Sequence, residues 1–166
     1  EAHRAGCKAL DALYGKRIDS LADIVVVSPG GAPKDMNLYQ AQKALDNAKH
    51  AVKKGGIIIL TAACIEGLGE STFEKWMTQA KEPDELIRRI RADFKLGGHK
   101  AAAIAMVMQS ADVYLVSDLP PELVKSIFFR PFGSAQQALD QAFCELGHDS
   151  KVLLMPCGGS TLPLLK

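Results

Sequence analysis

The chain has 166 residues, of which 48% are hydrophobic and 23% are charged, and its formal net charge is +1. This length is enough for one domain with a substantial core, and the nearly neutral charge argues against a nucleic-acid-binding protein. Because no apolar run reaches the roughly 18–20 residues of a membrane span and no signal peptide is recognisable, we expect a cytoplasmic protein without membrane contacts.

Short β-rich runs alternate with helical patterns along the chain. The predicted helices are Glu1–Leu13, Leu38–Lys54, Ser71–Gln79, Asp84–Asp93, Gly98–Gln109, Pro120–Ile127 and Ser134–Leu146. The predicted strands are Asp23–Ser28, Ile57–Thr61, Asp112–Ser117 and Lys151–Met155. Apolar strands separated by helices indicate βαβ units and a mostly parallel sheet. We therefore predict one α/β domain over residues 1–166, a Rossmann-like three-layer fold with about four or more strands.

The ends of several helices carry recognisable signals. Asn37 is the predicted N-cap of the second helix, which Gly55-Gly56 would close. Ser71, followed three residues later by Glu74, predicts a capping box. The chain opens within a helix and with Glu1 in place of methionine, so we expect it to be a piece of a longer protein.

The four cysteines are Cys7, Cys64, Cys144 and Cys157. No two of them share a CxxC spacing, and no histidine completes a zinc pattern. They are expected to be reduced thiols, although two structural disulfides are an alternative. No metal site is expected in this chain.

Three loops should meet at the edge of the sheet where ligands bind, beyond the carboxyl ends of the strands. They are Pro29–Asn37, Ala62–Glu70 and Pro156–Pro163. The first is longer than a βα turn requires, and its pair Gly30 and Gly31 lets the backbone approach a ligand. Gly158 and Gly159 place a second glycine pair at the same edge.

The helix that follows the first loop carries the strongest candidate site. Gln40 and Lys43 are three residues apart, so their side chains are neighbours on the face opposite the apolar stripe. Gln40 alternatively completes a capping box with Asn37, and Lys43 alternatively is a solvated surface lysine. A cation is unfavourable near a helix N-terminus, and an anionic ligand bound there would remove the conflict.

Weaker candidates lie in other segments. His99 and Lys100 open a buried helix after Gly97-Gly98, where an anion could be bound, but His99 is equally consistent with capping or packing. Glu66 either lines the cleft or is a solvated loop carboxylate. The segment Gly158–Thr161 is either an anion-binding nest or a simple turn.

Three sequence blocks resemble the C-terminal domain of nickel-dependent lactate racemases. The blocks are GGAPKDMNLYQAQKAL, starting at Gly30, FKLGGHKAAAIA (Phe94–Ala105) and MPCGGSTLP (Met155–Pro163). Their order agrees with that family, and together they span most of the chain. The resemblance implies a protein that racemises or epimerises small 2-hydroxy acids by reversible hydride transfer to a nickel-pincer nucleotide.

The resemblance also implies how the work is divided between two domains. In the family, the cofactor lysine, the nickel ligand and two acid–base histidines belong to an N-terminal domain, and no segment here matches it. A glutamine–lysine pair that contacts the substrate carries over to Gln40 and Lys43. We therefore expect a substrate-positioning domain without catalytic residues or bound nickel, whose partners are the 2-hydroxy acid and its own N-terminal domain.

Two other classes of protein were considered from the sequence. An independent nucleotide-dependent enzyme would need GxGxxG after a strand or a Walker A motif, and Pro29–Pro33 supplies neither. A non-catalytic ligand-binding or assembly domain stays open, because a fold does not fix a function.

Overall fold

A five-stranded parallel sheet forms the centre of the computed structural model, which describes residues 1–166. Its strand order is β5-β4-β3-β2-β6, and every neighbouring pair is parallel. The strands are β2 (Ala22–Val27), β3 (Val52–Thr61), β4 (Ala111–Val116), β5 (Arg130–Phe132) and β6 (Val152–Met155). The predicted parallel α/β architecture is confirmed.

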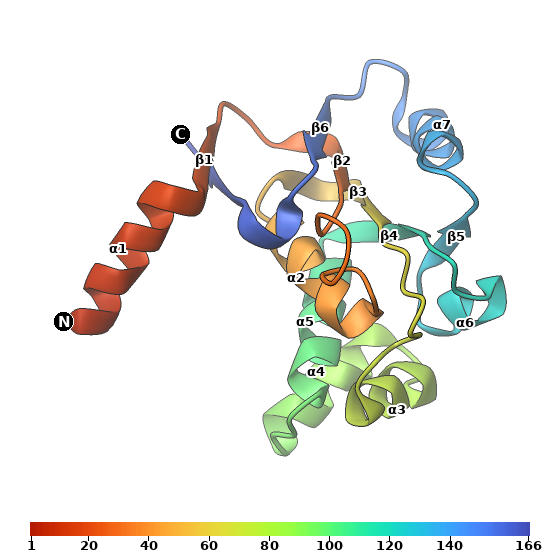
Figure 1. Cartoon of the computed structure of the whole chain (residues 1–166). Coiled ribbons are helices and arrows are strands. Elements are labelled where there is room, and N and C mark those ends of the chain that lie inside the picture. The colour runs from red at the N-terminus through yellow and green to blue at the C-terminus, as the bar shows by residue number, and fades with distance from the viewer.

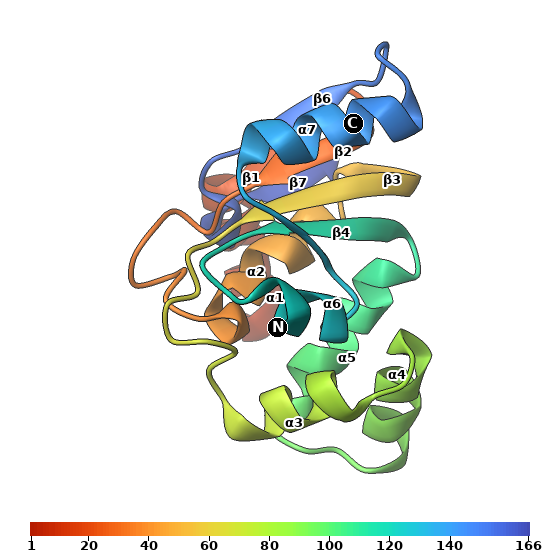
Figure 2. The same cartoon turned by 90° about the vertical axis from the view of Figure 1, so that its right-hand side faces the viewer.

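Helices cover both faces of the sheet, as Figures 1 and 2 show. One face carries α2 (Leu38–Ala48), α5 (Gly98–Met108) and α6 (Pro121–Ser126), and the other carries α7 (Ala135–Leu146); α3 (Ser71–Gln79) and α4 (Pro83–Ala92) pack beyond α5. The larger core of 32 buried residues lies on the α2 and α5 side, whereas α7 covers a core of 6. No helix is long and apolar enough to cross a membrane.

The remaining elements lie at the margin of the fold. Helix α1 (Ala2–Tyr14) has no buried residue and stands apart from the body in Figure 1. Strands β1 (Gly15–Ile18) and β7 (Leu162–Leu165) form a separate parallel pair, and the 3-10 turn η1 (Gly158–Ser160) precedes β7. Strands β1 (GKRI), β5 (RPF) and β7 (LPLL) were not predicted, because each is short and carries a glycine or a proline, which argues against a strand.

The strand order reverses between β2 and β6, and this reversal positions the loops. The chain moves from β2 through β3 and β4 to β5 on one side, then returns across the sheet through α7 to place β6 beside β2. Ligands of open parallel sheets bind beyond the carboxyl ends of the strands, close to such a reversal. The loops after β2 and β6 therefore flank the edge at which a ligand is expected.

The second helix is shorter than predicted. It ends at Ala48 rather than Lys54, and Val52, which lies within the predicted helix, begins β3 instead. Ala22 N–H donates to the Ala51 carbonyl at 2.8 Å, which draws this segment into the sheet. The pairing of β2 with β3 has an irregularity between Ala22 and Ile24, so the glycines predicted to end a helix accommodate an irregular strand instead.

The cap of α3 also differs from the prediction. Glu70, not Ser71, is the N-cap, and its carboxylate accepts from Thr72 N–H at 2.9 Å and Phe73 N–H at 2.8 Å. A carboxylate satisfies the free N–H groups as well as a hydroxyl does and also complements the helix dipole. These hydrogen bonds lower the pKa of Glu70, and the bond from Thr72 N–H has the largest effect.

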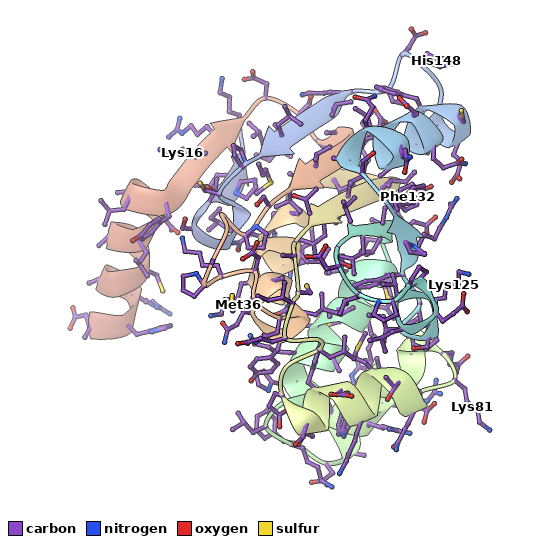
Figure 3. All side chains as sticks on the ribbon, turned by 45° about the vertical axis from the view of Figure 1, so that its right-hand side comes forward. Lys16, Met36, Lys81, Lys125, Phe132 and His148 are labelled. Carbon is purple, nitrogen blue, oxygen red and sulfur yellow. The ribbon has the colours of Figure 1, made fainter.

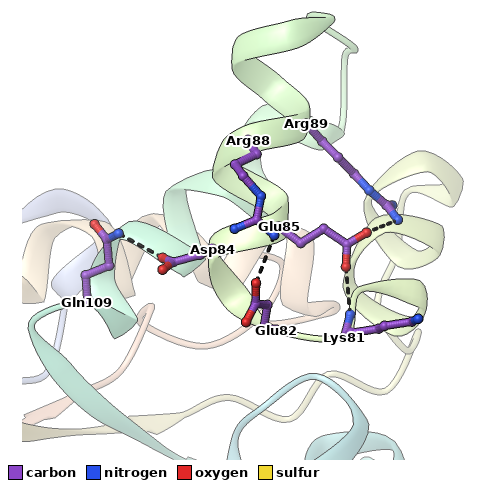
Figure 4. A network of polar contacts seen from close by, with 7 residues as sticks. All are labelled: Lys81, Glu82, Asp84, Glu85, Arg88, Arg89 and Gln109. Carbon is purple, nitrogen blue, oxygen red and sulfur yellow. Dashed lines mark hydrogen bonds and ion pairs between the residues drawn. The ribbon is translucent and has the colours of Figure 1, made fainter.

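Polar contacts join α4 to the elements around it (Figure 4). Glu85 accepts from Lys81 N–H at 2.9 Å and pairs with Arg89, while Arg88 pairs with Glu82 at 2.8 Å. Gln109, after α5, donates to Asp84 at 2.9 Å. The bond from Gln109 joins the start of α4 to the end of α5, and Arg88 and Arg89 are paired with nearby carboxylates.

We predict that Glu70→Ala destabilises the protein by about 0.5–2 kcal/mol at pH 7 through loss of the cap. A lowered folded-state pKa stabilises the fold above the unfolded-state pKa, and this stability is lost as pH falls through the folded-state value. The difference between wild type and variant in urea unfolding should therefore shrink between pH 7 and pH 3. Glu74→Ala, an exposed first-turn carboxylate without a cap bond, is the control; an equal Glu70→Ala effect at both pH values would contradict the assignment.

Candidate functional site

The first turn of α2 is fixed to the loop that follows β3. Asn37 caps the helix as predicted, because its Oδ1 accepts from Gln40 N–H at 3.0 Å. Its Nδ2 donates to Glu66 Oε2, also at 3.0 Å. Two of the predicted ligand-edge loops therefore meet through one side chain, and the Glu66 carboxylate has a protein donor.

Gln40 and Lys43 form a hydrogen-bonded pair. Lys43 Nζ donates to Gln40 Oε1 at 2.9 Å, and the two side chains are half-buried and exposed, respectively. The amide oxygen is thus turned toward Lys43 rather than back toward the Asn37 backbone, which disfavours the capping-box alternative. Because an ammonium only donates, this bond also fixes the orientation of the amide and leaves Gln40 Nε2 free to donate.

A pocket of about 590 Å³ opens beside this pair. Its lining residues are Pro33, Lys34, Met36, Asn37, Gln40, Lys43 and Glu66. Met36 lies on the loop next to α2 in Figure 3. Neither lysine forms an ion pair with a carboxylate, so the wall offers two unpaired cations and directional amide groups, a chemistry suited to a small carboxylate.

A second cavity lies at the carboxyl ends of β4 and β5. It has a volume of about 400 Å³ and is lined mainly by apolar side chains and backbone, with Ser117 and Lys125 as polar members. Lys125 is already paired with Glu122 at 2.7 Å. This cavity lacks an unpaired charge and is a weaker candidate for a carboxylate.

The predicted glycine pairs lie where the loops after β2 and β6 contact each other. Gly158 N–H donates to the Ser28 carbonyl at 2.7 Å, and Asn47 Nδ2 donates to the Gly158 carbonyl at 2.7 Å. A Cβ on Gly158 would lie 2.2 Å from Val27 Cγ2, so only glycine fits there. Gly30 and Gly31, with φ of 103° and 75°, let the first loop turn above this contact. The four glycines shape the edge and do not line the pocket.

The segment after β6 is a turn. The N–H groups of Gly158, Ser160 and Thr161 all donate within the protein, to the Ser28, Cys157 and Gly158 carbonyls. A nest would direct successive N–H groups to a ligand. The structure thus favours the turn over the nest for this segment.

His99 and Lys100 lie at the start of α5, outside the lining of the pocket. His99 Nδ1 accepts from Gly97 N–H at 3.2 Å, and its ring stacks on Phe94, so it serves a local capping and packing role. A Cβ on Gly97 would fall on the Glu70 carboxylate. A carboxylate of the protein itself therefore lies against this turn, where the sequence suggested an anionic ligand.

Lys100 reaches away from its own helix to α2. Its Nζ donates to the Tyr39 carbonyl at 2.5 Å and lies 3.9 Å from the centroid of the Tyr39 ring. Burial, followed by the charge of Lys43, lowers the pKa of Lys100 to about 8. The structure thus brings Lys100 to the helix that carries Gln40 and Lys43.

The chain does not fit a nickel site. All four cysteines are free, and nowhere do three or more His, Cys, Asp or Glu side chains come together. Burial raises the pKa of the Cys64 thiol to about 12, so this cysteine is a neutral core residue.

Sequence reasoning missed one residue that lines the pocket and one contact outside its lining. Lys34 lines it from the first loop, and its position three residues before Asn37 was the available signal. The Tyr39–Lys100 contact joins residues 61 positions apart, and no local pattern could predict it.

Comparison with known proteins gives one consistent family. Residues 18–162 match the family model described as lactate racemase C-terminal domain. The chain is 31% identical over 167 residues to the lactate racemase of Thermoanaerobacterium thermosaccharolyticum, covering 98% of this chain and 39% of the relative. It is 29% identical over 163 residues to the lactate racemase of Lactiplantibacillus plantarum, and the match covers 95% of this chain and 38% of that relative.

Solved structures agree with the sequence comparison. The lactate racemase apoprotein from T. thermosaccharolyticum superposes with a TM-score of 0.89 at 30% identity, over 98% of this chain and 40% of that one. A Thermotoga maritima protein gives 0.64 at 16% identity, covering 99% and 42%, and supports the fold alone. The chain spans about two fifths of the length of these relatives.

We predict that Gly158→Ala destabilises the fold by about 1–3 kcal/mol, because the new methyl group overpacks the contact with Val27. Gly159→Ala is the matched control, since its Cβ would lie 3.2 Å from the Pro29 carbonyl oxygen and needs only a small shift. Urea unfolding of both variants measures the difference. Equal stability of the two variants would show that the close approach at Gly158 does not constrain the edge.

Proposed function

The chain belongs to the lactate racemase C-terminal domain family, and from this premise we propose that it is the substrate-positioning domain of a 2-hydroxy-acid racemase or epimerase. The whole protein would then be an isomerase, of which this chain supplies one wall of the active-site cleft. Sites between two domains are common for small ligands.

The observation that carries this proposal is the paired Gln40 and Lys43 at the mouth of the pocket. Because Gln40 Oε1 accepts from Lys43, Gln40 Nε2 can donate to the hydroxyl or keto oxygen of a bound 2-hydroxy acid. The Lys43 ammonium can meet the carboxylate of the same molecule. One hydrogen bond inside the protein thus orients both donors toward adjacent oxygens of one ligand.

The charges around the pair favour an anion. Lys34 adds a second unpaired ammonium to the wall, whereas the single carboxylate, Glu66, accepts from Asn37. Fixed donors and cations that face a partly enclosed space bind anions more strongly than the same groups in open water.

We place the nickel-pincer nucleotide and the acid–base histidines in the part of the full-length protein that this chain does not span. The support is that the chain spans about two fifths of its relatives and offers no ligand set for nickel. The residues described here would bind and orient the substrate, and they would exclude water when the two domains close. The hydride chemistry would belong to the cofactor.

The 166-residue chain alone is expected to bind no nickel tightly and to turn over no lactate or malate. Metal analysis after dialysis against NiCl₂, beside a polarimetric racemisation assay, measures both. Stoichiometric nickel in the isolated chain would contradict the placement of the cofactor.

In the full-length, cofactor-loaded protein, we predict that Lys43→Ala lowers kcat/KM for the 2-hydroxy acid by about ten- to hundredfold. A charged hydrogen bond in a partly dry site contributes roughly 1.5–3 kcal/mol. Gln40→Ala should cost less, since its amide is neutral. Because Lys43 is exposed, its replacement should change the free energy of unfolding of the protein by only about 0.5 kcal/mol.

Lys49→Ala provides the control, because it removes a lysine from the far end of the same helix, where it pairs with Asp46 at 2.6 Å. Its kcat/KM should match wild type. A wild-type kcat/KM in Lys43→Ala would remove the substrate-positioning role and favour a non-catalytic binding or assembly domain.

A further inference from the structure

A second lysine is held behind the Gln40–Lys43 pair by a carbonyl and an aromatic ring. Lys100 of α5 donates to the Tyr39 carbonyl at 2.5 Å, and its ammonium lies 3.9 Å from the Tyr39 ring centroid. The ring is itself fixed by an edge contact with Phe73 at 5.5 Å between centroids. The ammonium therefore contacts α2 through a tyrosine whose ring packs against α3.

No carboxylate pairs with this ammonium within 4.0 Å. Tyr39 and Lys43 are one helical turn apart, so Lys43 lies on the same side of α2 as the carbonyl that Lys100 holds. From α2, the charges that act on Lys100 are those of Lys43 and Asp46. Asp46 pairs with Lys49 at 2.6 Å, so it only partly offsets the two neighbouring ammonium groups.

The other elements packed on α5 provide no closer compensation. On α4, Arg88 pairs with Glu82 and Arg89 with Glu85, while Asp84 accepts from Gln109 at the opposite end of α5. The charged residues of α3 are Glu74 and Lys75, both exposed, and β4 carries Asp112, also exposed. None of these is among the causes that shift the pKa of Lys100.

We propose that Lys100 is a positioning residue of the substrate pocket: it holds the first turn of α2 and adds a second positive charge behind Lys43. A carboxylate at Lys43 is then bound more tightly with both charges than with one. The inference rests on the proposed function, and it assigns to Lys100 an action through α2 and Lys43 rather than direct contact with the ligand.

The consequence is a proton linked to ligand binding. The second charge is present below the Lys100 pKa of about 8 and is lost as pH rises through that value. A bound carboxylate favours the charged form and raises the pKa. Binding above pH 8 should therefore take up a fraction of a proton, and affinity should fall between pH 7 and pH 9. A lysine that only stabilised α2 by packing would produce neither effect.

The test uses the full-length protein and 2-hydroxy-2-methylpropanoate, a lactate analogue that has no α-hydrogen and cannot be racemised. Isothermal titration at pH 7 and pH 9, in two buffers of different ionisation enthalpy, gives the Kd and the protons taken up. The wild-type Kd should rise about three- to fivefold between these pH values, as expected for the loss of one partly exposed charge. Proton uptake should be measurable at pH 8.5.

Two substitutions separate charge from packing. Lys100→Arg keeps a charge that does not titrate in this range. At both pH 7 and pH 9 it should bind the analogue about as tightly as wild type does at pH 7, and without proton uptake. Lys100→Met keeps the length without the charge and should bind weakly at both. Lys95→Met, an exposed lysine just before α5 that is paired with Asp93 at 3.6 Å, should behave as wild type.

The outcomes distinguish this inference from the function it rests on. Binding that is weakened in Lys43→Met but equal to wild type in Lys100→Met, with no proton uptake, overturns the role of Lys100 alone. If Lys100→Met fails to fold, the comparison of wild type with Lys100→Arg still decides, because pH-dependent binding in both variants overturns the inference. If wild type binds the analogue neither at pH 7 nor at pH 9, both proposals are overturned.

Discussion

The Gly158 N–H donates to the Ser28 carbonyl at 2.7 Å, and this hydrogen bond joins the loops that leave β2 and β6. Those strands are neighbours only because the chain crosses the sheet through α7 before it forms β6. The approach leaves no room for a Cβ against Val27, and Asn47 of α2 donates to the same glycine's carbonyl. The position of α2, and so of every candidate binding group on it, depends on this contact.

Once α2 is placed, a row of polar groups follows from helix spacing. Asn37 caps the helix and donates to Glu66. Gln40 and Lys43 form a hydrogen-bonded pair in the next turn, and Lys100 of α5 donates to the Tyr39 carbonyl beside them. The carboxylate of the row has a donor within the protein, while Lys43 and Lys100 lack a carboxylate partner. Under the proposed function, a ligand carboxylate would offset the repulsion between these two ammonium groups.

The same geometry explains why this domain would act with a second one. The pocket of about 590 Å³ is bounded by the loops after β2 and β3 and by the start of α2, so it forms a wall rather than an enclosed site. Under the proposed function Gln40 and Lys43 would bind and orient the substrate, but no three metal-binding side chains converge anywhere in the chain. A division in which one domain holds the substrate and another carries the reacting groups fits both observations, and domain closure would supply the dry environment that strengthens charged hydrogen bonds.

The sequence by itself determined the parallel α/β class, the order of the longer elements, the Asn37 cap and the pairing of Gln40 with Lys43, because each depends on a local period or on neighbours within one helical turn. It failed where distant segments compete for the same residues. Val52 was drawn from the helix pattern into β3 by pairing with β2, and Glu70 capped α3 in place of Ser71. Strands β1, β5 and β7 each carry a glycine or a proline within three or four residues, so their sequences do not predict strands. Only the tertiary structure decided that Gly158 packs beneath the site and that Lys100 reaches Tyr39, since hydrogen bonds between residues 61 or more positions apart form only after the chain has folded.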